Sequence, residues 1–112
     1  MNKSLSLLLG GFALLAPFIG APAWAGEHED ARMLASQCAQ CHGTDGRATG
    51  DIEPLDGKSR DSLYSDLIEM KYSTDRGELM HLQAKGYSDQ QLCTIARYFA
   101  HTPPTDTSPC RM

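Results

Sequence analysis

Two cysteines and a histidine stand close together in the segment Ser36–Gly46, which reads SQCAQCHGTDG. Cys38 and Cys41 are three residues apart, and His42 follows the second cysteine directly. In a helix, residues three and four apart lie on one face, so the three side chains would project to the same side. Two such thiols can form thioethers with the two vinyl groups of one haem while the imidazole reaches its iron, and C-x-x-C-H is the signature of that attachment. The spacing predicts one covalent haem c, held by Cys38 and Cys41 and ligated by His42.

A zinc site and a redox disulfide are the alternatives for the same motif. A structural zinc ion needs four ligands, usually from two closely spaced pairs, whereas the other cysteines, Cys93 and Cys110, form no such pair. A thioredoxin-like pair is expected in a βαβ setting, and no strand-like alternation is visible beyond residue 25. Haem attachment is therefore the favoured interpretation.

The second axial position of such an iron needs a further ligand, and methionine is the first candidate because its thioether raises the reduction potential. Met33 precedes the motif on the same helix, and Met112 is the last residue. Of the remaining two, Met70 ends an apolar helical pattern and is better explained as a core residue. Met80 follows a polar loop and is free to reach the far haem face, so it is the favoured distal ligand. The alternatives that stay open are Met70, His81 and His101.

The N-terminal segment is typical of an export signal. Lys3 precedes a long apolar run, and Ala23-Trp24-Ala25 has the small-x-small pattern of a cleavage site. An uncleaved anchor is the alternative, but Pro17 and Pro22 interrupt the run, which falls short of the roughly 20 residues that span a bilayer. We expect residues 1–25 to be removed and the mature protein to lie in the periplasm without stable membrane insertion.

The remaining residues 26–112 are expected to form one domain with a Pro-rich tail at 102–112. This part has nine Lys and Arg against fourteen Asp and Glu, a formal charge of −5 with neutral histidines. That balance argues against nucleic acid as a partner. A chain this short commonly needs a cofactor or a disulfide to stabilise its small core.

Hydrophobic periodicity predicts helices and no sheet. The expected helices cover residues 30–40, 59–71 with Ser59 as the cap, and a last one that opens at Ser88 with Gln91 in the capping-box position and ends before Pro103. Residues 43–57, rich in glycine, are expected to form a loop. The expected inward residues are Ala31, Leu34, Ala35, Cys38, Leu63, Tyr64, Leu67, Ile68, Leu92, Ile95, Ala96 and Phe99, and those expected to contact the haem are Leu34, Tyr64, Leu67, Ile95 and Phe99.

The segments CAQCHGTDGR, IEPLDG and LMHLQAKGYSDQQLCTIARYFA, in this order, resemble the monohaem class I cytochromes c, in particular the cytochrome subunit of flavocytochrome c sulfide dehydrogenase. The resemblance implies an all-α class I cytochrome c fold of three to five helices around one covalent haem, with His42 proximal and Met80 distal. It also implies that a backbone carbonyl accepts the ring N–H of His42. Relatives often have proline where Glu53 stands, which leaves open which carbonyl serves.

Cys93 and Cys110 lie outside the motif. Leftover cysteines of an exported protein tend to pair, so a disulfide between them is expected; a free, buried Cys93 is the alternative. The predicted function is the transfer of single electrons, not catalysis, with redox proteins as partners, among them a sulfide-oxidising flavoprotein. The alternatives are a freestanding carrier of another respiratory chain and a haem domain whose labile sixth ligand admits gases or peroxide. A basic rim around the haem edge is expected from Arg47, Lys71, Arg76 and Lys85.

Overall fold

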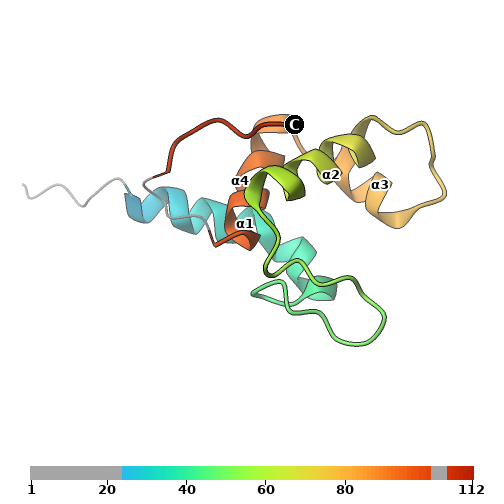
Figure 1. Cartoon of the computed structure of the whole chain (residues 1–112), viewed down its shortest axis with the longest axis horizontal. Coiled ribbons are helices and arrows are strands. Elements are labelled where there is room, and N and C mark those ends of the chain that lie inside the picture. The colour runs from blue at the N-terminus through green and yellow to red at the C-terminus, as the bar shows by residue number, and fades with distance from the viewer. Residues whose placement is uncertain (1–23, 102–105) are drawn as a thin grey trace, which may run out of the picture.

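The computed structural model describes residues 24–101 and 106–112, with side chains described from residue 30 onward (Figure 1). Within this part of the chain the regular elements are four helices and no strand: α1 (Trp24–His42), α2 (Arg60–Tyr72), α3 (Leu79–Lys85) and α4 (Asp89–Phe99). The predicted all-α class is therefore confirmed. The predicted signal segment 1–25 lies, except for its last two residues, outside the described residues. Every helix in the described part is too short or too polar to cross a bilayer.

The two predicted helix starts are confirmed by their caps. The Ser59 hydroxyl accepts a hydrogen bond from the backbone N–H of Ser62 at 3.2 Å, at the start of α2. At the start of α4, the Ser88 hydroxyl accepts from the Gln91 N–H, while the Gln91 side chain accepts from the Ser88 N–H. Each cap satisfies amide groups that have no partner within the helix.

Glycines end α1 and start the long loop to α2. Gly43 and Gly46 have φ values of +82° and +75°, in the left-handed region that glycine tolerates best. A Cβ on Gly43 would lie 2.6 Å from the Arg47 carbonyl oxygen, so no larger side chain fits there. The Gly46 carbonyl then accepts hydrogen bonds from the amides of Leu55 and Asp56, which closes residues 46–56 into a compact loop.

The core lies where α4 packs against both α1 and α2 (Figure 1). Its most buried large side chains are Leu92 and Phe99 on α4, each 1% exposed. The predicted inward faces are confirmed except at Ala31, which is half-buried and not part of the core. The core consists of Ala35, Leu63, Ile68, Leu92, Ile95, Ala96 and Phe99, with Leu34, Cys38, Tyr64 and Leu67 packed against it.

Two boundaries differ from the sequence prediction. Helix α1 begins at Trp24 and not near residue 30, because no proline interrupts the segment between them. The sequence predicted a segment near the haem at Met80 but no helix there. Helix α3 has seven residues, and no side chain caps it at Glu78, so the usual signal of a helix start is missing. It packs against α2, where the Lys85 ammonium donates to the Met70 and Ser73 carbonyls.

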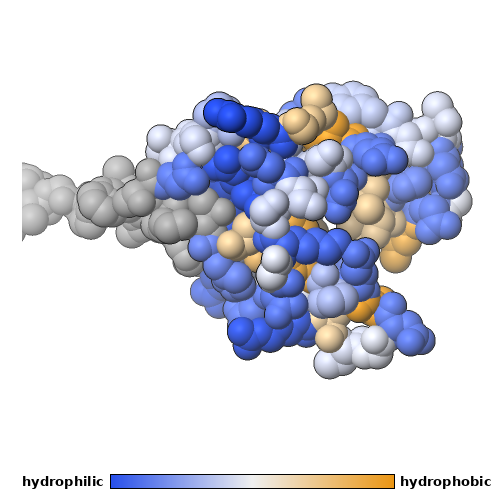
Figure 2. Space-filling model, viewed as in Figure 1, coloured by the Kyte–Doolittle hydropathy of each residue, from blue (hydrophilic) through white to orange (hydrophobic). Residues whose placement is uncertain are grey.

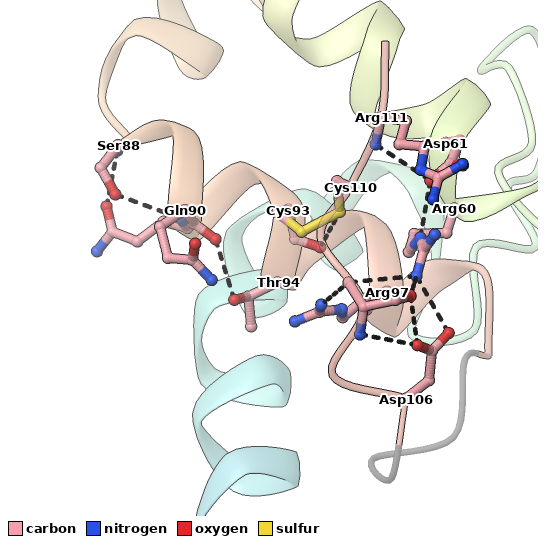
Figure 3. Close-up of a disulfide and its surroundings, with 12 residues drawn as sticks. Arg60, Asp61, Ser88, Gln90, Cys93, Thr94, Arg97, Asp106, Cys110 and Arg111 are labelled. Carbon is pink, nitrogen blue, oxygen red and sulfur yellow. Dashed lines mark hydrogen bonds and ion pairs between the residues drawn. A yellow bond between two sulfur atoms is a disulfide. The ribbon is translucent and has the colours of Figure 1, made fainter.

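The C-terminal tail is fastened to the helices (Figure 3). Cys93 on α4 forms the predicted disulfide with Cys110, with Cα atoms 5.8 Å apart. Arg60 at the start of α2 binds Asp106 at 3.1 Å, and Arg97 donates to the Ser108 carbonyl. The tail therefore joins the N-terminal end of α2 to α4.

Candidate haem site

The C-x-x-C-H residues occupy the last two turns of α1. Cys38 is half-buried, Cys41 is exposed and His42 is 8% exposed. Both cysteines are free thiols. Burial raises the pKa of the Cys38 thiol, and the nearby Cys41 raises it further by a smaller amount. These three side chains are together at the end of one helix, as the spacing predicted.

A small cavity of about 70 Å³ lies beside this helix end. All four helices and the loop before α2 contribute to its wall, which is largely apolar. The residues that line it are Cys38, His42, Glu53, Leu55, Lys58, Leu63, Asp66, Leu67, Met70, Met80, Ile95, Ala96 and Phe99.

The imidazole of His42 is held by one backbone carbonyl. Its Nδ1 lies 2.7 Å from the Glu53 carbonyl oxygen. Because a carbonyl can only accept, Nδ1 carries the proton and Nε2 keeps a lone pair for a metal. A second-shell acceptor of this kind fixes the orientation and raises the basicity of a metal-bound histidine. The structure thus identifies the Glu53 carbonyl as the acceptor that the sequence left open.

Two methionines line the same cavity, Met70 at the end of α2 and Met80 in the first turn of α3. The two histidines named as alternatives do not line it. His81 is half-buried, with an Nδ1 atom that has no partner among the described residues, and His101 is exposed. The geometry therefore brings His42 and Cys38 together with Met70 and Met80.

Three of the five residues expected to contact the haem line the cavity. Leu67, Ile95 and Phe99 line the cavity, but Leu34 and Tyr64 do not. Both of those side chains lie instead beside a separate depression next to α4 and the tail. Helical periodicity identifies an inward face but not which neighbour that face meets.

Several lining residues were not singled out in the sequence as haem contacts. Leu55 and Lys58 lie in the irregular segment before α2, where no periodicity indicates direction. Lys58 Nζ lies 2.5 Å from Glu53 Oε1 and 3.9 Å from Asp66 Oδ2. The Lys58 ammonium lowers the pKa of the Glu53 carboxyl, mainly through this hydrogen bond and then through its charge.

The expected basic rim is weaker than the sequence suggested. Arg47 lies 3.5 Å from Asp56, and Lys71 lies 2.5 Å from Asp89, so two of the four cations have acidic partners. Lys85 donates to backbone carbonyls. Pairing leaves less positive charge for steering than four free cations would supply.

The donor set fits a covalent haem and not a zinc site. No group of three or more His, Cys, Asp and Glu side chains suited to a metal ion occurs among the described residues. Cys93 and Cys110 are joined to each other and cannot complete a zinc site with Cys38 and Cys41. What remains is a pair of free thiols, an oriented imidazole and an apolar cavity, which is the chemistry of a haem attached through thioethers. The fold and site thus define a c-type cytochrome.

Comparison with known proteins supports this class. The chain is 36% identical over 69 residues to the cytochrome subunit of sulfide dehydrogenase of Chlorobaculum tepidum. The matched region is 62% of this chain and 63% of that protein. It is 31% identical over 71 residues to cytochrome c-553 of Helicobacter pylori, covering 62% of this chain and 74% of that protein. It is 36% identical over 67 residues to cytochrome c-554(548) of Halomonas halodenitrificans, covering 56% and 81%. No protein-family profile matches the chain.

The chain belongs to the monohaem c-type cytochromes and is similar to the cytochrome subunit of sulfide dehydrogenase. As a member of this family it carries covalent haem c and serves electron transfer. It spans slightly less than two thirds of the length of the sulfide dehydrogenase subunit.

Proposed function

We propose that this cytochrome transfers single electrons through a haem whose iron is ligated by His42 and Met80. The observation that carries the proposal is the cavity itself, since one apolar space is lined by His42, with its Nε2 lone pair free, and by a methionine from another helix. Haem supplies an iron that cycles between the ferrous and ferric states. The role of the protein is to attach the haem through Cys38 and Cys41, orient His42 and exclude water with Leu67, Ile95 and Phe99.

Met80 is preferred to Met70 because of the helix on which each residue stands. Met70 belongs to α2, which is anchored in the core through Leu63 and Ile68. Helix α3 has seven residues, a single buried side chain, Ala84, and contacts mainly α2. A short element with few buried contacts adjusts more readily than a core helix. The Met80 thioether can therefore approach the iron at lower cost, in agreement with the family resemblance.

If His42 and Met80 both held the iron, no open position would remain for a substrate, and the bound haem would only accept and donate electrons. A thioether ligand and an apolar surrounding both raise the reduction potential. We expect a redox titration to show one one-electron transition. Rapid carbon monoxide binding by the ferrous protein would instead indicate an open or labile sixth position and would contradict the proposal.

We further propose that the protein works in the periplasm and accepts electrons from a sulfide-oxidising flavoprotein. Support comes from the resemblance of residues 1–25 to an export signal and from the name of one relative, a cytochrome subunit of sulfide dehydrogenase. Mass spectrometry of the purified protein should give an N-terminus at Gly26, whereas retention of Met1 would refute cleavage. A flavoprotein that co-purifies should reduce the ferric haem on addition of sulfide, with sulfide alone as the control. No reduction above the control would exclude this partner.

A freestanding carrier is the second candidate. Relatives named only as cytochromes c-553 and c-554(548) are covered over 74% and 81% of their length. On the face shown in Figure 2 the surface is mostly hydrophilic, and hydrophobic side chains appear in small areas. Small interfaces are typical of transient redox encounters. A monomer in sedimentation analysis, with no flavoprotein attached, would favour this candidate over a permanent subunit.

A further inference from the structure

We propose that Lys58 is a positioning residue for the iron ligand His42, acting through Glu53. The proposal rests on the assignment of His42 as the proximal ligand. Glu53 accepts the ring N–H of His42 through its backbone carbonyl, and Lys58 holds that carbonyl in place by binding the Glu53 side chain. Lys58 touches the Glu53 side chain, and the carbonyl of the same residue touches His42.

The geometry forms a short chain of contacts. The Lys58 ammonium donates to Glu53 Oε1 at 2.5 Å, and the Glu53 carbonyl accepts from His42 Nδ1 at 2.7 Å. All three residues line the cavity. A displacement of residue 53 would therefore move the acceptor of the ring N–H. The orientation of a metal-bound histidine depends on this type of contact.

The backbone around Glu53 needs such a restraint. Glu53 is exposed, with 67% of its side-chain surface accessible, and it lies between Gly50 and Gly57, which adopt φ values of +71° and +79°. Nothing lies within 4 Å of where a Cβ would stand at either glycine, so neighbouring atoms do not confine these two positions. Glycine gives a loop more conformational freedom than other residues. The nearest loop-closing backbone bonds are made by Leu55 and Asp56, on one side of Glu53.

Lys58 also connects the loop to a fixed element. Its ammonium lies 3.9 Å from Asp66 of α2, a helix anchored in the core through Leu63 and Ile68. The Lys58 side chain is 29% exposed, so it is shielded more than an ordinary surface lysine. A cation shared by two carboxylates therefore holds residue 53 against α2.

A second lysine provides a matched control. Lys71 lies 2.5 Å from Asp89, the same separation as in the Lys58–Glu53 pair, and its side chain is 18% exposed. This pair connects α2 to α4, and neither residue lines the cavity. Loss of a lysine ion pair in general can thus be separated from loss of the contact to Glu53.

The test is the deuterium exchange rate of the His42 Nδ1 proton in the ferrous holoprotein, followed by NMR. We expect Lys58→Met to accelerate exchange about two- to five-fold, the range that an ion pair at the surface can supply. Lys58→Arg, which keeps a cation facing Glu53, should stay near the wild-type rate. Lys71→Met should leave the rate unchanged.

The decisive comparison is made in the Glu53→Gln background. If Lys58 acts through Glu53, Lys58→Met should add nothing to the exchange rate of Glu53→Gln. An equal acceleration in both backgrounds would overturn the proposal, because Lys58 would then act on the haem directly. An unchanged rate in Lys58→Met would also overturn it. If the wild-type protein shows no ring-current-shifted Nδ1 proton of His42, the assignment of His42 as ligand fails, which is distinguishable from failure of the role of Lys58 alone.

Discussion

Removal of the tail disulfide by Cys110→Ala should lower the free energy of unfolding by about 3 kcal/mol. The disulfide connects Cys93 and Cys110, which are 17 positions apart. In the chain-entropy model, closing a loop of this length in the unfolded chain stabilises the folded state by roughly 3 kcal/mol. Cys93 would stay in the core as a free thiol, 5% exposed, and a buried free cysteine behaves as a small apolar residue. The cost is thus expected to come mainly from the lost cross-link.

The polar contacts of the tail provide the comparison. The Ser108 hydroxyl contacts Arg60 and Asp106, and both of these contacts are near the surface. Ser108→Ala keeps the disulfide and should cost no more than about 1 kcal/mol, as for other exposed polar pairs. Urea unfolding of the holoproteins, followed by far-ultraviolet circular dichroism, measures both changes. If Cys110→Ala were no more destabilising than Ser108→Ala, the disulfide would contribute no more to stability than a polar contact at the surface, which would contradict this prediction.

Three further predictions concern the core, the loop and the dependence on pH. Leu92→Ala should lower the free energy of unfolding, measured in urea, by about 2–5 kcal/mol because Leu92 is 1% exposed. Leu82→Ala, at a residue of α3 that is 50% exposed, should change it by no more than about 0.5 kcal/mol. Equal losses in the two variants would contradict the assigned core. Gly46→Ala should destabilise the fold more than Gly50→Ala. Both glycines have positive φ, but only a Cβ at Gly46 would clash, because it would lie 2.9 Å from the backbone nitrogen of Asp56. Equal melting temperatures of the two variants would refute this. The hydrogen bond from Lys71 lowers the pKa of Asp89, so the folded protein binds fewer protons there than the unfolded chain, and the free energy of unfolding should fall as the pH drops through that pKa. Asp89→Asn should reduce this dependence of stability on pH in the acid range. An unchanged dependence would contradict the pairing.

The parts of the fold that were predictable are those with local signals. Ser59 and Ser88 are capping residues followed by helical periodicity, and both start helices in the structure. The inward faces of α2 and α4 were read from the same spacing and are confirmed by the core. The glycines after His42 indicated the end of α1, because a turn there requires positive φ.

The parts that were not predictable depend on tertiary contacts. Helix α3 has neither a capping side chain nor the length to show a clear period, so it forms against α2 without an independent signal. Lys58 and Leu55 reach the cavity only because the loop closes on Gly46. The identity of the carbonyl that accepts from His42 depends on the same closure.

In the candidate site too, residues fixed by short spacing were predictable, whereas residues brought together by helix packing were not. The C-x-x-C-H motif specifies three residues through short spacing alone, and the structure places them at one helix end. Leu34 and Tyr64 were expected to contact the haem, yet they line a separate depression beside α4 and the tail and not the cavity that contains His42. Residues contributed by separate helices, such as Met70 and Met80, require the packing angle between those helices, which the sequence pattern does not contain.

The central claim of ligation by His42 and Met80 is tested most directly by the near-infrared absorption of the ferric protein. Methionine bound to ferric haem gives a weak sulfur-to-iron band in this region. We expect the band in the wild-type protein and in Met70→Ala, and its loss in Met80→Ala, since both methionines line the cavity but only Met80 is assigned to the iron. A band that survives in Met80→Ala and disappears in Met70→Ala, or a wild-type protein without the band, would contradict the assignment.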